Sequence, residues 1–413
     1  MLNNSFHYRA EALHCDAVSI EEIAAVTGTP VYIYSLKRAL ENYNRLASAF
    51  APLNAHIHYS AKANANLALL RALISAGAGI DCVSGGEIHK ALLAGCPPEQ
   101  IVFAGVGKTP GDLSYAVEQH VGWVNIENED ECRILEQIAA EHGRQMHVAL
   151  RYNPDIAANT IRQIATGHGG AKFGLTADAI HRILSNASDY PSLRFEGIHI
   201  HIGSQLGDTS ATRAAIRSAN ALIAAHPQLR TLNIGGGFPA AYRSSEVFPD
   251  ATVFAEAIAS EIGDRQLIIE PGRSIVADAG ILVAQVLYVK EHGGQKFVIL
   301  DAGMTDLMRP ALYDAHHEIV PVRLHPGEQV REMVEIVGPV CETTDTLASQ
   351  RLIAPLKPGD RVAILTTGAY GFVMASTYNA RPRPPEVVIS SDGSAWQVAR
   401  QRETWEAMTE PEL

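Results

Sequence analysis

The sequence predicts an α/β barrel, a (β/α)₈ or TIM barrel, followed by a β-rich domain. Between residues 55 and 273, eight short apolar segments alternate with segments of helical spacing. Past residue 280 strand-like runs continue, but no long helical segments separate them. Alternation sustained over about 220 residues is typical of a (β/α)₈ barrel. An open, doubly wound sheet is the alternative topology that the same alternation allows.

The chain begins with a segment that we assign to the β-rich domain. "TPVYIYS" at 29–35 has strand character and no helical partner of its own. The predicted domains are therefore an N-terminal segment over 1–35, a barrel over 36–280 and a C-terminal β-barrel domain over 281–413.

The eight predicted barrel strands are short apolar runs that end in glycine, asparagine, serine or charged residues. Helical spacing is clearest at 66–77 and 130–143, and a glycine-rich loop at 158–175 follows the fifth strand. The predicted strands cover 55–61, 79–84, 101–105, 122–127, 146–153, 195–204, 231–237 and 267–273.

The predicted C-terminal domain consists of apolar runs that turn residues separate, as expected for consecutive strands. These runs start at residues 280, 295, 331, 360 and 385.

Composition excludes several classes of function. The net charge of −12 argues against a nucleic-acid or anionic-membrane surface. The longest apolar runs fall short of the roughly 20 residues that span a bilayer. The first residues show no apolar signal core, so we expect a cytoplasmic protein. Five scattered cysteines without a CxxC pair predict neither a disulfide framework nor a metal site.

Polar residues follow the predicted barrel strands, and the chemistry of such barrels gathers at the carboxyl ends of the strands. We therefore expect these residues to share one rim: Lys62, Arg151, His201, Ser204, Gly235, Gly236, Gly237, Glu270, Pro271, Gly272 and Arg273.

This set of residues suits pyridoxal phosphate. The amine of Lys62 can form a Schiff base with an aldehyde cofactor. Backbone N–H groups of the glycine triplet, with Ser204 and the Pro-Gly-Arg turn, suit a phosphate. Glu270 can keep the pyridine nitrogen protonated, and His201 can lie against the ring.

Each residue also has an ordinary structural interpretation. Lys62 could be a solvated charge and His201 a hydrogen-bonded core histidine. The glycine triplet alone is a weak phosphate motif, and "EPGR" could be a turn with a surface ion pair. The cofactor hypothesis explains all of them together.

Several motifs in order resemble the fold-type III pyridoxal-phosphate decarboxylases, and among them most closely the diaminopimelate decarboxylases. The resemblance spans about residues 5 to 395. The motifs are "YSAKAN", "DCVSGGE", "HIHIGSQ", "NIGGGF", "EPGRSIVADAG", "DAGMTDLMRPALYDA", "GPVCETTD" and "GAYGFVMASTYNARPRPPEV".

The resemblance implies an alanine racemase-like pairing of the two domains, a head-to-tail homodimer and a carboxy-lyase that makes L-lysine from meso-2,6-diaminopimelate. It implies that Lys62 carries the cofactor, which Gly237, residues 270–273 and Tyr370 help to bind. It assigns Arg273, Arg309, Tyr313 and Tyr370 to the substrate. Cys341 and Glu342 would complete the site of the partner subunit.

The substrate that this family acts on carries a distal carboxylate and a distal ammonium, which both need partners when buried. Arg273 and Arg309 suit the carboxylate because a guanidinium can form two parallel hydrogen bonds with it. Glu342 suits the ammonium. Cys341 is the candidate acid that returns a proton after CO₂ leaves, with a packing role as its alternative. If residues 309–313 are helical, Arg309 and Tyr313 share a face.

Three other functions compete with this one. A paralogous decarboxylase of siderophore or antibiotic synthesis would keep the cofactor motifs, and Ile161, where the family usually has histidine, leaves that possibility open. An amino-acid racemase would place arginine at the pyridine nitrogen, whereas this chain has Glu270. A non-catalytic regulator would tend to lose Lys62 or Cys341, and both are present.

Overall fold

The computed structural model describes residues 1–156, 170–324 and 330–413. The chain forms two compact units. Unit 1 comprises Met1–Glu41, Ala241–Val247 and Ile275–Leu413, and unit 2 comprises Asn42–Ala240 and Phe248–Ser274. The two units are described in turn.

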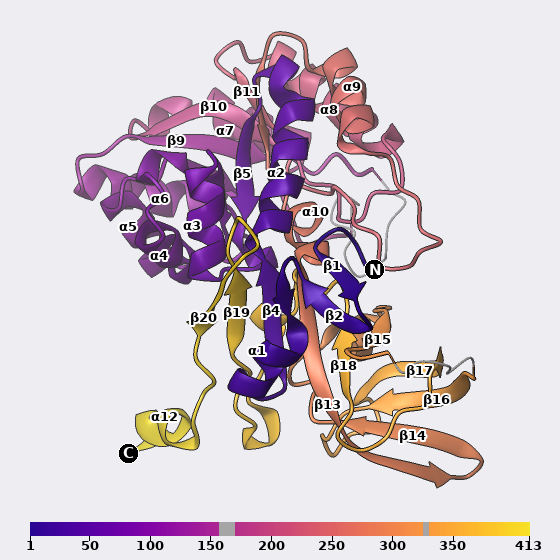
Figure 1. Cartoon of the computed structure of the whole chain (residues 1–413). Coiled ribbons are helices and arrows are strands. Elements are labelled where there is room, and N and C mark those ends of the chain that lie inside the picture. The colour runs from indigo at the N-terminus through magenta and orange to yellow at the C-terminus, as the bar shows by residue number, and fades with distance from the viewer. Residues whose placement is uncertain (157–169, 325–329) are drawn as a thin grey trace. The chain divides into compact units, whose positions relative to one another are not determined.

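Unit 2 is a closed barrel of eight parallel strands, which confirms the predicted fold class and excludes the open sheet (Figure 1). Each of the eight predicted segments overlaps one of these strands, although β10 and β12 begin before the predicted bounds. They are β5 (His56–Ser60), β6 (Gly79–Cys82), β7 (Ile101–Phe103), β8 (Trp123–Ile126), β9 (Met146–Arg151), β10 (Leu193–His199), β11 (Thr231–Asn233) and β12 (Gln266–Ile269). The barrel closes between β12 and β5 through the pairs Ile268–His56 and Ile269–Ile57.

All eight strands end earlier than predicted, and the difference is largest for β10, β11 and β12. β11 stops at Asn233 because Gly235 and Gly237 have φ values of 65° and 106°, which no strand can continue. β10 stops at His199, and the chain then bends so that His201 meets the glycine triplet. His201, Ser204 and the three glycines therefore lie in loops that follow the strands.

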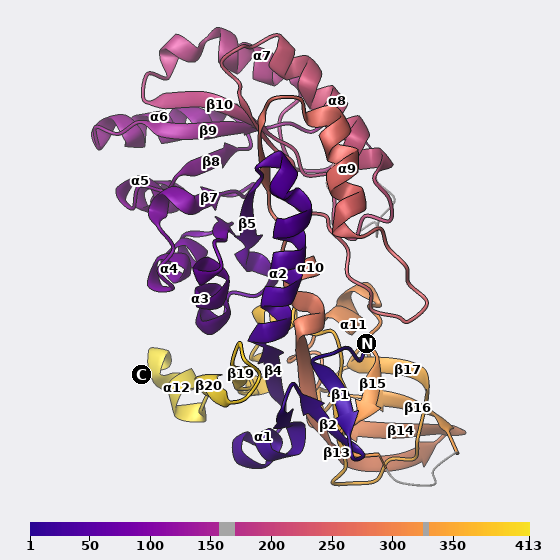
Figure 2. The ribbon, with the colours of Figure 1, turned by 45° about the horizontal axis from the view of Figure 1, so that its top comes forward.

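Helices lie outside the barrel strands (Figure 2). Most begin at a side chain that accepts a hydrogen bond from the first turn; Thr109 and Asp112, for example, form a capping box. Their bounds are α3 (Leu67–Ser75), α4 (Gly85–Leu93), α5 (Pro110–Glu118), α6 (Glu129–Glu141), α7 (Ala177–Ser185), α8 (Ser210–Ala224) and α9 (Ala251–Ile262). Two further helices, α2 (Leu36–Phe50) and α10 (Arg273–Val276), include residues of both units.

Unit 1 contains a nine-stranded sheet whose main path runs β17-β16-β14-β13-β4-β19-β20. β4 (Val31–Ser35) pairs with β13 (Gly280–His292) and β19 (Glu386–Ile389). The other strands of this sheet are β14 (Gln295–Leu300), β15 (Ile319–Pro321), β16 (Glu332–Val337), β17 (Thr346–Ile353), β18 (Arg361–Ile364) and β20 (Trp396–Arg400).

A smaller sheet and three short α-helices also belong to the described part of unit 1. The sheet is formed by β1 (Phe6–Arg9), β2 (Ala12–Cys15) and β3 (Val18–Ser19). The helices are α1 (Ile20–Thr27), α11 (Arg309–Tyr313) and α12 (Trp405–Thr409). Apolar side chains from the first strands, α1, β4, β13 and β19 form one buried core.

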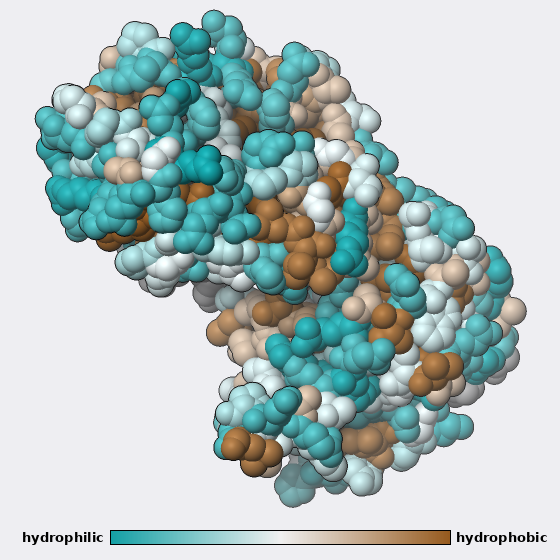
Figure 3. All heavy atoms as spheres, turned by 90° about the vertical axis from the view of Figure 1, so that its left-hand side faces the viewer, coloured by the Kyte–Doolittle hydropathy of each residue, from teal (hydrophilic) through white to brown (hydrophobic). Residues whose placement is uncertain are grey.

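Hydrophilic residues cover most of the face drawn in Figure 3, where hydrophobic residues form smaller patches. In the part of the chain that the structure describes, no helix combines the length and the apolar character that crossing a membrane requires.

Candidate active site

Lys62 lies just after the first barrel strand, in the helical turn Ala61–Ala63. Its Nζ atom is 3.1 Å from Oδ2 of Asp81, which is on the neighbouring strand β6. The Lys62 side chain is 35% exposed, whereas that of Asp81 is fully buried. The structure therefore holds a partly accessible amine at the carboxyl end of the barrel.

Asp81 is a buried carboxylate that the sequence analysis did not single out. Ser60 Oγ and Lys62 Nζ both donate to its Oδ2 atom. Burial raises the pKa of Asp81, and the charge of Glu270 acts in the same direction against the pull of Lys62. Its Oδ1 atom is buried and has no hydrogen-bond partner among the described residues.

Glu270 follows β12 and is almost completely buried. Asn233 Nδ2 donates to its Oε1 atom over 2.5 Å, and Asn125 Nδ2 over 3.4 Å. His199 Nε2 lies 3.4 Å from Oε2, within ion-pair distance but outside hydrogen-bond geometry. Burial alone would raise the pKa of Glu270, but His199, Lys62 and Asn233 outweigh it and lower that pKa. Glu270 is therefore held as a carboxylate.

Two amides of the glycine triplet are already used within the barrel. Gly235 N–H donates to Asn233 Oδ1 over 2.9 Å, and Gly236 N–H donates to His201 Nδ1 over 3.2 Å. For the amide of Gly237 the described residues provide no acceptor. Of the three amides expected to bind a phosphate, the amide of Gly237 is therefore the one that can donate a hydrogen bond to it.

The glycines also allow close packing of the backbone. A Cβ atom on Gly236 would lie 2.5 Å from the carbonyl oxygen of Glu270, and one on Gly237 would lie 2.7 Å from Leu206 Cδ1. A Cβ on Gly272 would lie 3.0 Å from the Cβ atoms of Ser60 and Ala63. Side chains at these positions would push the loops apart.

Hydrogen bonds and an ion pair hold the remaining predicted rim residues in place. Arg273 Nε donates to Ser204 Oγ over 3.1 Å, and Ser60 N–H donates to the carbonyl of Pro271 over 3.0 Å. Arg151 forms a buried ion pair with Glu127. His201 has a pKa well below its usual value because it is buried and lies near Lys62 and Arg151.

In unit 1, Arg309 is fixed at the start of α11. Its Nη1 donates to His317 Nε2 over 2.9 Å, and its guanidinium lies 4.4 Å from the ring centre of Tyr242. His317 Nδ1 is 2.9 Å from the Leu365 carbonyl, and burial lowers the pKa of His317 well below its usual value. A neutral imidazole therefore orients the guanidinium. Tyr313 is the last residue of the same helix.

Cys341 and Glu342 occupy a loop of unit 1 and are exposed. We call them the loop pair. Tyr378 donates from its hydroxyl to Glu342 Oε1 over 2.6 Å. Asp345 shapes the loop, because its carboxylate accepts from Met304 N at 2.6 Å and from Val340 N at 2.7 Å.

Tyr370, which follows β18 in unit 1, has a φ of 55°, an uncommon value for a residue other than glycine. Ile161, the departure from the family pattern, lies outside the described residues.

The structure thus brings the predicted rim residues of unit 2 together at the carboxyl ends of the strands and leaves five predicted residues in unit 1. The sequence analysis missed Asp81, Asn125, His199 and Asn233. All four lie near the carboxyl ends of barrel strands, so the same strand-end rule applied to every strand would have found them. We call Lys62, Asp81, His201, Asn233 and Glu270 the barrel cluster.

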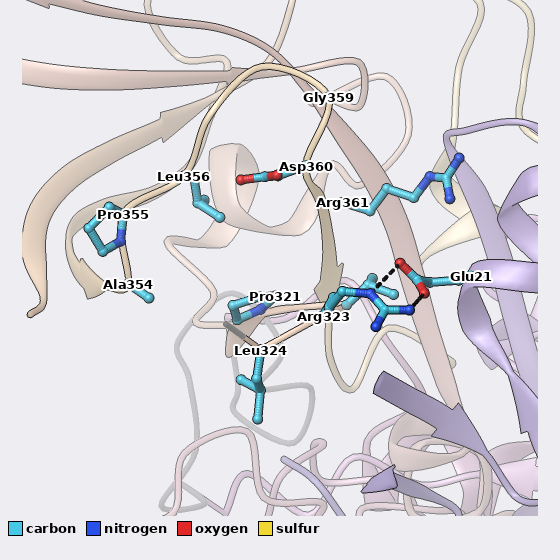
Figure 4. Close-up of a pocket in the computed structure, with 11 residues that line it drawn as sticks. Glu21, Pro321, Arg323, Leu324, Ala354, Pro355, Leu356, Gly359, Asp360 and Arg361 are labelled. Carbon is cyan, nitrogen blue, oxygen red and sulfur yellow. Dashed lines mark hydrogen bonds and ion pairs between the residues drawn. The ribbon is translucent and has the colours of Figure 1, made fainter. Parts of the chain in front are cut away.

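The barrel cluster fits pyridoxal phosphate. Lys62 offers an amine, Glu270 an ionised carboxylate, and Asp81 an oxygen that has no hydrogen-bond partner among the described residues. The cavity in Figure 4 is a different feature. It has a volume of about 170 Å³, lies in unit 1 and contains none of these residues.

Comparisons with known proteins agree with this chemistry. Residues 36–277 match the family model "Pyridoxal-dependent decarboxylase, pyridoxal binding domain". The diaminopimelate decarboxylase of Aquifex aeolicus is 40% identical over 417 residues, which cover 100% of this chain and 98% of that protein.

Solved structures are similar over the same length. The diaminopimelate decarboxylase of M. jannaschii in complex with L-lysine has a TM-score of 0.94 and 33% identity, covering 100% of this chain and 99% of that one. The Helicobacter pylori enzyme with L-lysine has a TM-score of 0.89 and 37% identity, covering 95% and 98%. The chain therefore belongs to the diaminopimelate decarboxylases, a family of pyridoxal-phosphate-dependent enzymes.

Proposed function

We propose that this protein decarboxylates meso-2,6-diaminopimelate to L-lysine and CO₂, the last step of lysine biosynthesis. The observation that carries the proposal is the buried Glu270, to which two asparagines donate, on the same barrel rim as Lys62. A carboxylate at that position sustains a protonated pyridine nitrogen, which decarboxylation needs and which an arginine would oppose. L-lysine in two related structures supports the choice of product.

When bound, pyridoxal phosphate supplies an aldehyde and a ring that accepts the electrons released as CO₂ leaves. Lys62 would hold the cofactor covalently through Nζ. Glu270 would keep a proton on the ring nitrogen, and His201, neutral at its lowered pKa, would lie against the ring. Ser204, the amide of Gly237 and residues 270–273 would bind the phosphate.

The remaining roles concern the substrate. Arg273 and Arg309 would bind its distal carboxylate, with Tyr313 and Tyr370 beside it. The prior fixing of Arg309 by His317 reduces the entropy lost on binding. The thiol of Cys341 would return a proton to the carbon that has lost CO₂.

We further propose a cytoplasmic homodimer in which Cys341 and Glu342 of the partner subunit complete each site. Both residues are exposed, although a proton donor and a partner for a buried ammonium need a water-poor site. Five free cysteines suit a reducing compartment.

The test is to incubate the cofactor-loaded protein with meso-diaminopimelate and to measure CO₂ and lysine. We expect both products, together with a visible absorption band that disappears in Lys62→Ala. Turnover of ornithine or arginine in place of diaminopimelate would overturn the substrate assignment. A colourless, inactive wild type would overturn the enzymatic function.

A further inference from the structure

Unit 1 contains a cavity of about 660 Å³ that none of the proposed active-site residues lines. One wall is formed by Pro310 and Ala311 of α11, and another by the edge strand β17, which packs beside α11 (Figure 2). Arg243, His316, Glu318 and Arg331 line the remainder. A volume of this size is typical of a small-molecule site.

Arg351 of β17 is one of the three arginines that line this cavity. Its side chain is 14% exposed, and its Nη1 donates to Glu318 Oε2 over 3.2 Å. Both ring nitrogens of His316 lie within 3.4 Å of the same guanidinium. Burial lowers the pKa of His316, and Arg351 adds to that effect, so the imidazole brings no second positive charge. Arg351 therefore has one carboxylate to balance it.

Further arginines leave the cavity with an excess of positive charge. Arg243 and Arg331 also line it, and neither forms an ion pair within the ranges that the structure describes. The lining carboxylates are Glu318 and Asp314, fewer than the three arginines. In a chain whose net charge is −12, such a local excess favours binding of an anion.

The cavity in Figure 4 provides a contrast. There Arg323 forms an ion pair with Glu21 across the pocket, as the dashed lines show. That cavity is lined by two arginines and two carboxylates, whereas the larger cavity is lined by three arginines and two carboxylates. The difference indicates that the larger cavity is built for an external negative charge.

The neutral side chains that line the larger cavity indicate the chemistry of the rest of the ligand, beyond its negative charge. Thr344, Thr346, Ser349 and Gln350 bring hydroxyl and amide groups to the lining. Arginine clusters recognise phosphate through paired, charge-assisted hydrogen bonds. We propose that this cavity binds a phosphate monoester of a small hydroxylated molecule, with its phosphate against Arg351 and Arg243 and its body along Thr344 and Ser349.

Isothermal titration of the cofactor-loaded protein tests the proposal with three probes: ribose 5-phosphate, inorganic phosphate and ribose. We expect ribose 5-phosphate to bind most tightly, inorganic phosphate more weakly and ribose not at all. Loss of one arginine should weaken binding of ribose 5-phosphate at least about tenfold. The variants are Arg243→Gln and Arg351→Gln.

Arg71→Gln is the matched control, because Arg71 is an exposed arginine of α3 in unit 2. It should bind ribose 5-phosphate as the wild type does. Arg351→Gln also removes a contact with Glu318, so the exposed Arg243 gives the cleaner test.

Three results would overturn the proposal. One is the absence of ribose 5-phosphate binding at millimolar concentration. Another is unchanged affinity in Arg243→Gln. Equal affinity for inorganic phosphate and ribose 5-phosphate would contradict the proposed contacts with the ester body and leave a site for free phosphate.

Discussion

The barrel cluster and the loop pair differ most in burial. In the barrel, Glu270 is buried and receives hydrogen bonds from two asparagines, and Lys62 already has a carboxylate partner. In unit 1, Cys341 and Glu342 stand exposed on a loop that Asp345 shapes. A single chain therefore already holds in place the residues proposed to bind the cofactor. The loop pair, in contrast, is shielded from water only when another surface covers it.

This contrast has a physical basis. The charges of the barrel cluster must be buried to act strongly, so each needs partners within the same chain. The loop pair needs no such partners while water solvates it. If a second subunit covers it, both residues become parts of a site in that subunit.

The largest effect on activity should come from the loop pair. Cys341→Ala should lower kcat by roughly 10²–10⁴-fold, the range for loss of a positioned proton donor, with little change in KM. Steady-state release of CO₂ measures both constants. Cys341→Ser should retain part of the activity, and unchanged kcat in Cys341→Ala would refute the proton-donor role.

Glu270→Gln should have the next largest effect on activity. We expect kcat to fall about 10²–10³-fold because one preorganised charge is lost. The amide keeps the shape and can still accept from Asn233, so the cofactor should still bind. A shifted absorption spectrum at full cofactor occupancy would confirm that the charge matters. Full activity would show that the ring nitrogen needs no carboxylate.

Glu342→Gln should act on substrate binding. We expect KM for diaminopimelate to rise about tenfold, because one charge-assisted hydrogen bond to the ammonium is lost. Tyr378→Phe is the matched control. It removes the hydroxyl that donates to Glu342 but leaves the carboxylate, so its KM should change less. A larger rise in Tyr378→Phe than in Glu342→Gln would count against the assignment.

Glu87 should affect stability and not activity, and its pKa is raised to about 7, mainly by burial. The folded state therefore favours the protonated form of Glu87. The stability that this protonation contributes is fully present below pH 4.5 and is lost as pH rises through 7. Glu87→Gln should therefore gain stability relative to wild type over that window, by about 3 kcal/mol at most.

Urea unfolding at pH 5 and pH 8 measures this difference. Glu256→Gln, at an exposed position on α9, is the control and should show no such change with pH. An equal difference between Glu87→Gln and wild type at both pH values would contradict the raised pKa.

Much of the fold could be predicted because alternation of strands and helices is a local signal. It located all eight barrel strands and placed Lys62 and Glu270 at strand ends. The partners of these residues could not be predicted in the same way. Asn233 meets Glu270 only because β11 and β12 are neighbours in the closed barrel, and Gly236 meets His201 only because both loops bend inward.

Sequence patterns likewise could not predict how the guanidinium of Arg309 is held in place. It depends on Tyr242 and His317, and on the Leu365 carbonyl, which is distant in sequence. The motif "DLMRPALY" identified the arginine but not the groups that orient it.

The most direct test of a shared site is to mix two inactive variants, Lys62→Ala and Cys341→Ala, under conditions that exchange subunits. If each site combines Lys62 of one subunit with Cys341 of its partner, random mixing of equal amounts restores about one quarter of wild-type activity. If both residues act within one chain, every mixed dimer stays inactive. No recovery of activity, with subunit exchange verified, would contradict the account.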